Sequence, residues 1–130
     1  MKLKILPIIL LIIILAGCGK VAEKGTDMAY KQISMSEAMK LMESETGYII
    51  LDVRRIDEFA AGHIPNAINV PNENIGSAQI AELPDKDQLI LVYCRSGRRS
   101  KEASEKLVKL CYTNVVEFGG IIDWNGEIEK

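Results

Sequence analysis

A cysteine followed closely by three arginines is the group of residues in this sequence best suited to chemistry. Cys94 precedes Arg95, Arg98 and Arg99 in the segment Cys-Arg-Ser-Gly-Arg-Arg-Ser, which ends at Ser100. Guanidinium groups repel one another unless an anion or acidic residues compensate them, and positive charge favours a thiolate over a thiol. The segment therefore predicts a nucleophilic cysteine that reacts with an anionic substrate, with at least one of the arginines in contact with that substrate.

The elements expected on either side of Cys94 strengthen this prediction. An apolar, β-branched run at residues 89–93 predicts a buried strand before the cysteine, and residues 99–110 predict a helix after it. Gly97 permits a positive φ in the loop between them, and the helix directs its positive end toward the sulfur. We expect loop amides to converge on the sulfur. The alternative, a small buried cysteine without chemistry, does not need Gly97 or so many arginines.

Other apolar patterns place this loop in an α/β fold. Strands are expected at residues 48–53, 67–70 and 115–118, and helices after Ser34 and around residues 57–61 and 76–81. Strands that alternate with helices indicate a mostly parallel central sheet flanked by helices on both faces. Ligands bind such sheets at the carboxyl ends of the strands. This rule selects the two segments at residues 52–58 and 94–100.

The first residues of the chain have the pattern of an export signal. Lys2 and Lys4 precede an apolar run at residues 5–15, which is too short for a stable span of about 20 residues. Residues 15–18, Leu-Ala-Gly-Cys, resemble the lipobox of bacterial lipoproteins. The resemblance implies cleavage before Cys18 and acylation of that cysteine. An uncleaved anchor or an ordinary secretory signal stays open, and both place the domain outside the cytoplasm.

The chain therefore divides into three predicted parts. Residues 1–17 are a lipoprotein signal peptide, residues 18–29 are the lipidated cysteine and a polar tether, and residues 30–130 are one folded domain. We expect an extracytoplasmic protein of the cell envelope, anchored to the membrane through lipid. Removal of the signal takes away two lysines and changes the formal net charge from -2 to -4. The absence of a basic stripe with interleaved aromatics argues against nucleic-acid binding.

Three stretches of the chain resemble the rhodanese homology domain, over about residues 31–128. They are LDVRRIDEFAAGHIPNAINVP at residues 51–71, CRSGRRS at residues 94–100 and FGGIIDW at residues 118–124. The resemblance implies a sulfurtransferase with a persulfide on Cys94, an anionic sulfane-sulfur donor such as thiosulfate, a thiol or cyanide acceptor, and no metal or organic cofactor. It also implies that the substrate is bound by Arg95, Ser96, Gly97, Arg98 and Arg99.

Four further residues are expected to support the site. The resemblance implies that Asp52 and Arg54 support the loop through hydrogen bonds and ion pairing. Glu58 has the spacing to pair with Arg54 or Arg55 across a helical turn. His63 invites a general-base role, but the resemblance treats its Gly-His-Ile-Pro turn as structural, which is the interpretation we favour.

Cys111 raises the question of a disulfide with Cys94. If Cys18 is acylated, these two are the thiols left in a compartment that favours oxidation. The helix expected between them separates its ends by roughly 16 Å, whereas a disulfide needs Cα atoms within about 7 Å. We therefore expect a free Cys94 and a packing role for Cys111. The rhodanese homology domain commonly has a glycine at this helix end, and a side chain there in a left-handed conformation costs roughly 1 kcal/mol.

The sequence allows three alternatives to an active sulfurtransferase. Cysteine phosphatases have a C-x5-R loop, whereas Cys94 and Arg99 give C-x4-R, a tighter loop that suits a single sulfur better than phosphate or arsenate. A persulfide or redox carrier for a protein acceptor stays open. The intact loop disfavours a non-catalytic binding module, and we expect a monomer.

Overall fold

The sheet that carries the site has five parallel strands in the order β1-β5-β4-β2-β3. The computed structural model describes residues 29–76 and 78–130, so the predicted signal peptide and nearly all of the tether lie outside the described residues. The strands are β1 (Lys31–Gln32), β2 (Ile49–Asp52), β3 (Ile68–Asn69), β4 (Ile90–Cys94) and β5 (Val115–Gly120). The helices are α1 (Met35–Ser44), α2 (Ile56–Ala61) and α3 (Arg98–Lys109), with short 3₁₀ turns at Asn72–Asn74 and Ile121–Asp123.

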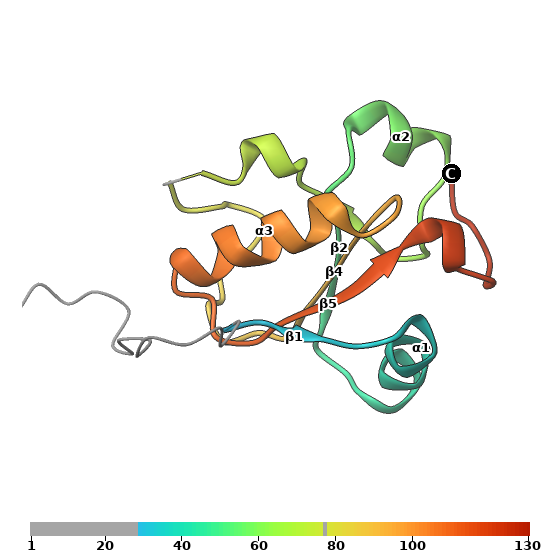
Figure 1. Cartoon of the computed structure of the whole chain (residues 1–130), viewed down its shortest axis with the longest axis horizontal. Helices are drawn as coiled ribbons and strands as arrows, with labels where there is room; N and C mark the ends of the chain where they lie inside the picture. The colour runs from blue at the N-terminus through green and yellow to red at the C-terminus, as the bar shows by residue number, and fades with distance from the viewer. Residues whose placement is uncertain (1–28, 77) are drawn as a thin grey trace, which may run out of the picture.

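Alternating side chains of the central strands supply a core on each face of the sheet. Val92 and Cys94 of β4 pack with Leu107 of α3 on one face, whereas Leu91 of β4 packs with Ala38 of α1 on the other. Figure 1 shows α3 and α1 on opposite sides of the sheet. Because both faces are covered, the central strands are continuous apolar runs without polar alternation. The predicted α/β fold with a parallel central sheet and helices on both faces is confirmed.

The carboxyl ends of β2 and β4 meet at the middle of one sheet edge. Asp52, the last residue of β2, is in register with Tyr93 of β4. The chain leaves β2 toward β3 on one side, while β4 and β5 lie on the other, so the strand order reverses here. This reversal opens a crevice at the carboxyl edge of a parallel sheet. The segments after Asp52 and after Cys94 therefore lie together, as the sequence predicted.

The local signals for the first helix are confirmed, but one predicted helix is wrong. Ser34 and Glu37 form the expected capping box, with reciprocal hydrogen bonds of 3.1 Å. Of the helix predicted at residues 76–81, residues 76 and 78–81 are described and none is helical. Ile80 is buried in the core, but the described residues beside it, at positions 78, 79 and 81, are exposed, so the segment has no apolar helical face to pack. Strand β1 was not predicted, since it has two exposed residues and no apolar pattern.

The two cysteines on either side of α3 differ in their bonding. Cys94 is a free thiol, whereas Cys111 is disulfide-bonded. The two are therefore not joined, in agreement with the helix length between them, but the expectation of a packing thiol at Cys111 is wrong. Cys111 also has a φ of 72°, so the chain tolerates a side chain in the left-handed turn that follows the helix.

Candidate active site

The Cys94 sulfur lies beneath the loop that follows β4. Cys94 is only 1% exposed, because its side chain faces α3 and joins the core on that side of the sheet. The Gly97 N–H donates a hydrogen bond to Sγ at 3.0 Å, and the Ser100 Oγ lies 3.4 Å from Sγ. Gly97 has a φ of 109°. In the part of the chain described, the Gly97 N–H is the one backbone amide that donates to the sulfur. The expectation that several loop amides converge on an accessible thiol is therefore wrong.

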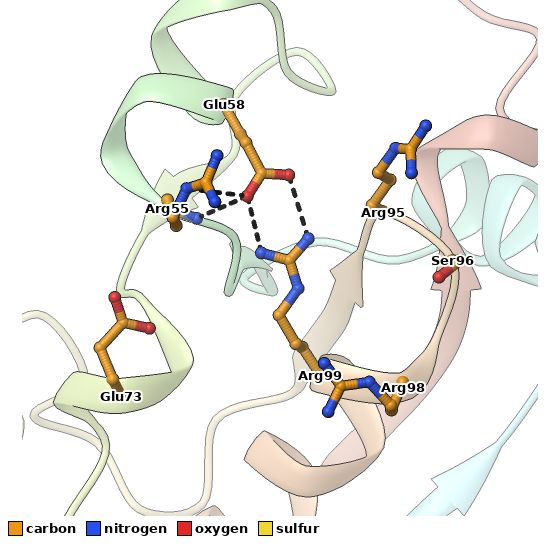
Figure 2. Close-up of a pocket in the computed structure, with 7 residues that line it drawn as sticks. All are labelled: Arg55, Glu58, Glu73, Arg95, Ser96, Arg98 and Arg99. Carbon is orange, nitrogen blue, oxygen red and sulfur yellow. Dashed lines mark hydrogen bonds and ion pairs between the residues drawn. The ribbon is translucent and has the colours of Figure 1, made fainter.

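A charged pocket of about 690 Å³ opens beside this loop. Figure 2 shows Arg95 and Glu73 on opposite sides of the pocket, with Arg99 and Glu58 between them. Four arginines and two glutamates line it, so its charge is positive in a domain that is acidic as a whole. The lining residues are Arg55, Glu58, Glu73, Arg95, Ser96, Arg98 and Arg99. The structure thus brings most of the predicted binding residues to one cavity, while Gly97 contacts the sulfur.

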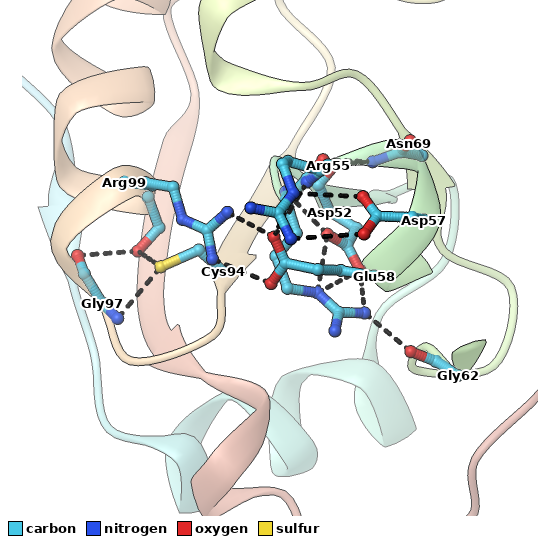
Figure 3. A network of polar contacts seen from close by, with 11 residues as sticks. Asp52, Arg55, Asp57, Glu58, Gly62, Asn69, Cys94, Gly97 and Arg99 are labelled. Atoms are coloured by element: carbon cyan, nitrogen blue, oxygen red, sulfur yellow. Dashed lines mark hydrogen bonds and ion pairs between the residues drawn. The ribbon is translucent and has the colours of Figure 1, made fainter. Parts of the chain in front are cut away.

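Arg99 is held in the pocket by a two-point ion pair with Glu58. Arg99 Nη1 lies 2.7 Å from Glu58 Oε1, and Nη2 lies 3.0 Å from Oε2. Arg55 Nε approaches the same carboxylate at 3.6 Å, so the expected pairing of Glu58 with Arg55 is present but secondary, and a pairing with Arg54 is wrong. In Figure 3 Arg99 lies between Cys94 and Glu58. The pair therefore links α2 to α3 and fixes one guanidinium beside the sulfur.

The pair makes a specific prediction for the acid stability of the domain. Hydrogen bonds from Arg99 lower the pKa of Glu58 from 4.5 to about 2. A lowered pKa in the folded state stabilises the fold above pH 4.5 and loses that contribution as the pH falls to about 2. We expect the urea midpoint of the wild type to fall across this interval. The Glu58→Gln variant should show a smaller fall, and equal slopes for both proteins would contradict the prediction.

Asp52 and Arg54 form a second, fully buried ion pair at the end of β2. The Asp52 carboxylate accepts hydrogen bonds from the Arg54 backbone N–H, from Nε and from Nη2, the last at 2.7 Å. Arg54 Nη2 also donates to the Gly62 carbonyl at 2.7 Å (Figure 3). Asn69 of β3 donates to the carbonyls of Asp52 and Arg54. Neither Asp52 nor Arg54 lines the pocket, so they support the segment that carries Arg55 and Glu58.

His63 makes contacts of a structural kind. Its ring stacks on Phe59 with the centroids 3.8 Å apart, and Nδ1 lies 2.9 Å from the Phe59 carbonyl oxygen. Its backbone pairs with Glu129 in an isolated antiparallel bridge. His63 does not line the pocket. Its Nε2 lies 3.9 Å from Glu129 Oε2. His63 therefore closes the turn after α2, and neither it nor Glu129 lines the pocket.

Two features of the site were not predicted as functional. Glu117, a buried carboxylate of β5, contacts Ser100, which in turn contacts the Cys94 sulfur. Gly120 lies so close to the loop that a Cβ would overlap the Arg95 carbonyl. That carbonyl also accepts a hydrogen bond from the Ile122 N–H at 3.2 Å. The paired glycines of the FGGIIDW stretch were the signal in the sequence that this segment packs against the loop.

Within residues 29–76 and 78–130, no group of three or more His, Cys, Asp and Glu side chains could hold a metal ion. In the same part of the chain, no helix has the length and apolar character needed to cross a membrane.

These observations describe an α/β protein with a buried free cysteine at the carboxyl edge of a parallel sheet, beside an arginine-lined pocket. The sequence of residues 34–127 matches the model of the rhodanese-like domain family. The chain belongs to this family, which includes sulfurtransferases.

Named relatives and solved structures agree with the family. The chain is 36% identical over 73 residues to the thiosulfate sulfurtransferase PspE of Escherichia coli, covering 56% of this chain and 70% of that protein. It is 37% identical over 92 residues to a sulfurtransferase of Allochromatium vinosum, covering 70% of this chain and 83% of that protein. A rhodanese-like domain protein from Staphylococcus aureus superposes with a TM-score of 0.66 at 29% identity, covering 76% of this chain and 96% of that structure.

Some relatives are much longer than this chain. It is 32% identical over 120 residues to the adenylyltransferase and sulfurtransferase UBA4 of Candida albicans. The match covers 87% of this chain but 27% of that protein.

Proposed function

We propose that this protein transfers sulfane sulfur from an anionic donor such as thiosulfate to a thiol or cyanide acceptor through a persulfide on Cys94. The observation that carries the proposal is a free cysteine at the carboxyl end of the central strand, with a backbone amide 3.0 Å from its sulfur and a positively charged pocket beside it. A guanidinium-lined pocket attracts a small dianion. The names of the relatives support the reaction class.

The proposed reaction has two half-reactions at one sulfur. In the first, the Cys94 thiolate attacks the outer sulfur of thiosulfate, a new S–S bond forms, and the donor's S–S bond breaks as its electron pair leaves with sulfite. In the second, a thiolate or cyanide attacks the outer sulfur and Cys94 leaves as a thiolate. Because only 1% of Cys94 is exposed, we expect the loop at residues 95–97 to move when the donor enters.

Mass spectrometry of the Cys94 peptide tests the proposal directly. Incubation with thiosulfate should add one sulfur atom to this peptide, and cyanide should then remove it with release of thiocyanate. A Cys94 peptide that gains no sulfur, under conditions in which the protein is folded, would overturn the proposal.

Arg95 is the pocket arginine best placed to meet the donor. In the described residues its side chain makes no hydrogen bond or ion pair, whereas Arg99 is held by Glu58 and Arg98 by Glu102 at 3.0 Å. We expect Arg95→Ala to raise the KM for thiosulfate about fivefold, with a smaller change in kcat, as for the loss of one solvent-exposed ion pair.

The matched control for Arg95 is Lys101→Ala, which removes one exposed positive charge outside the pocket. Equal KM values for the two variants would assign the effect to net charge and would contradict a direct contact between Arg95 and the donor.

A persulfide carrier for a protein acceptor is the second candidate function. Ile122 is 62% exposed although it is a large apolar residue, and its backbone contacts the loop at Arg95. In this second candidate function, a protein acceptor docked at the loop would contact the exposed Ile122 side chain. High turnover with small thiols would favour an enzyme of broad use, whereas persulfide transfer that requires a protein acceptor and depends on Ile122 would favour a carrier.

We also propose that the chain is a lipoprotein of the cell envelope, with its domain boundary near residue 30. The support is the sequence pattern of residues 1–18, which lie outside the described residues. Mass spectrometry of the mature N-terminus should show Cys18 as the first residue, carrying fatty acyl groups. A Cys18 engaged in a disulfide cannot carry the thioether of a lipid anchor, so recovery of that form from cells would contradict the proposal.

A further inference from the structure

A buried hydroxyl group contacts the Cys94 sulfur, and a buried carboxylate contacts that hydroxyl group in turn. The Ser100 Oγ of α3 lies 3.4 Å from Sγ and 2.7 Å from Glu117 Oε1 of β5. Ser100 is completely buried, and Glu117 is 3% exposed. The same Oε1 accepts a hydrogen bond from the Gly119 N–H at 2.8 Å. The sulfur is thus separated from a carboxylate by one hydroxyl group.

The single proton of the Ser100 hydroxyl decides the electrostatics of this arrangement. Three acceptors surround Oγ: Glu117 Oε1 at 2.7 Å, the Gly97 carbonyl at 2.9 Å and the Gly119 carbonyl at 3.4 Å. The carboxylate is both the closest and the charged acceptor, so it accepts the hydrogen bond from the Ser100 hydroxyl. Oγ then faces the sulfur with a lone pair, which accepts a hydrogen bond from a thiol but opposes a thiolate.

The charges around the sulfur act in opposite directions. Arg99 attracts negative charge on Cys94, as their mutual electrostatic interaction shows, and the N-terminus of α3 acts in the same sense. Glu117 opposes it, because two negative groups so close in a buried site cannot both be ionised without a large cost. Tyr30 directly precedes β1, and its pKa is raised chiefly by burial and also by the charges of Glu105 and Glu117. No ion pair of Glu117 is present among the described residues.

We infer that Glu117, acting through Ser100, is a positioning residue that keeps the proton on the Cys94 sulfur at rest and receives it when the sulfur reacts. The Cys94 S–H bond breaks as an O–H bond forms at Ser100, whose own proton moves to Glu117 Oε1, so the chain of groups holds the same number of protons throughout. When the second half-reaction releases Cys94 as a thiolate, the proton returns by the same route. This inference deepens the proposed sulfur transfer. It also implies that the resting thiol resists oxidation in an oxidising compartment, because oxidants react with the thiolate form of cysteine.

The pH dependence of Cys94 alkylation tests the inference without any sulfur donor. The Glu117→Gln variant removes the negative charge and lets the Ser100 proton turn toward the sulfur, while keeping an oxygen that can accept from Gly119. We expect the pH midpoint for reaction of Cys94 with iodoacetamide to fall by about one unit, which makes the reaction about tenfold faster at neutral pH. Peptide mass spectrometry restricts the measurement to Cys94. The matched control is Glu105→Gln, which changes an exposed glutamate of α3 that has no hydrogen bond with Cys94 or Ser100 in the described residues and should leave the midpoint unchanged.

If the Glu117→Gln variant does not fold, a second measurement on the wild-type protein tests the same inference. Carbon-13 NMR of glutamate-labelled wild-type protein should show a second inflection of the Glu117 carboxyl signal at the pH where Cys94 ionises, and this inflection should be absent from Cys94→Ser. An unchanged or higher alkylation midpoint in folded Glu117→Gln, or a Glu117 signal insensitive to Cys94, would overturn the inference. Failure of the wild type to take up sulfur would overturn the proposed function alone, since neither measurement uses a sulfur donor.

Discussion

Replacement of Cys94 by serine is expected to reduce sulfur transfer by about 10³-fold or more, because a hydroxyl oxygen cannot form the persulfide and the loss of a nucleophile removes the covalent route. Serine is close in size to cysteine, and its Oγ can accept the Gly97 N–H that now bonds to Sγ. The fold should therefore survive the change. Thiosulfate-dependent formation of thiocyanate is the measurement, with circular dichroism as the check on folding.

Cys111→Ala is the matched control for this experiment. Cys111 follows the far end of α3, a helix of 12 residues that is about 18 Å long. We expect this variant to retain most of the activity per folded molecule. If Cys94→Ser is folded and as active as the wild type, Cys94 has no part in the mechanism. If folded Cys111→Ala loses activity, the assignment of a single reactive cysteine is wrong.

Asp52→Ala is expected to produce the largest loss of stability, about 3–5 kcal/mol in the free energy of unfolding. Asp52 is completely buried and accepts hydrogen bonds from the backbone and the guanidinium of Arg54, which is 6% exposed. Removal of the carboxylate leaves a buried positive charge that keeps the Gly62 carbonyl and, 5.8 Å from its centroid, the Tyr93 ring as contacts. Urea or guanidinium denaturation followed by circular dichroism measures the change.

Asp57→Ala provides the comparison for Asp52. Asp57 also pairs with an arginine, Arg55, at 3.1 Å, but its side chain is 72% exposed. Water replaces such a partner at little cost, so the denaturation midpoint should stay close to that of the wild type. Similar losses in the two variants would show that burial does not determine the contribution of the Asp52–Arg54 pair.

The sequence predicted the fold where local signals and the buried pattern agree. The capping box at Ser34 fixes the start of α1, and the β-branched runs mark β2 and β4, which are buried on both faces. The helix expected at residues 76–81 is absent from the described part of this segment, where Ile80 alone is buried and no apolar face exists to stabilise a helix. Strand β1 has only the hydrogen bonds of an edge strand and no apolar pattern to reveal it.

The candidate site was predictable in its members more than in its contacts. The position of Cys94 after a buried strand and the arginines that follow it are visible in the chain, and four of the predicted loop residues line the pocket. The partner of Glu58 was not predictable, because Arg99 lies 41 positions away and a nearer arginine satisfies the spacing rule. The Ser100–Glu117 contact depends on how α3 packs on β5, which no local pattern encodes.

The parallel direction of all five strands gives the domain two unlike ends. Since β1 begins near the first described residue and runs in the same direction as β4, the chain enters at the amino end of the sheet, while Cys94 terminates a strand at the other end. A lipid attached upstream would therefore tether the domain at the amino edge of the sheet, opposite the edge that carries Cys94. Solutes and partner proteins could then approach the sulfur from the aqueous side without competition from the bilayer surface.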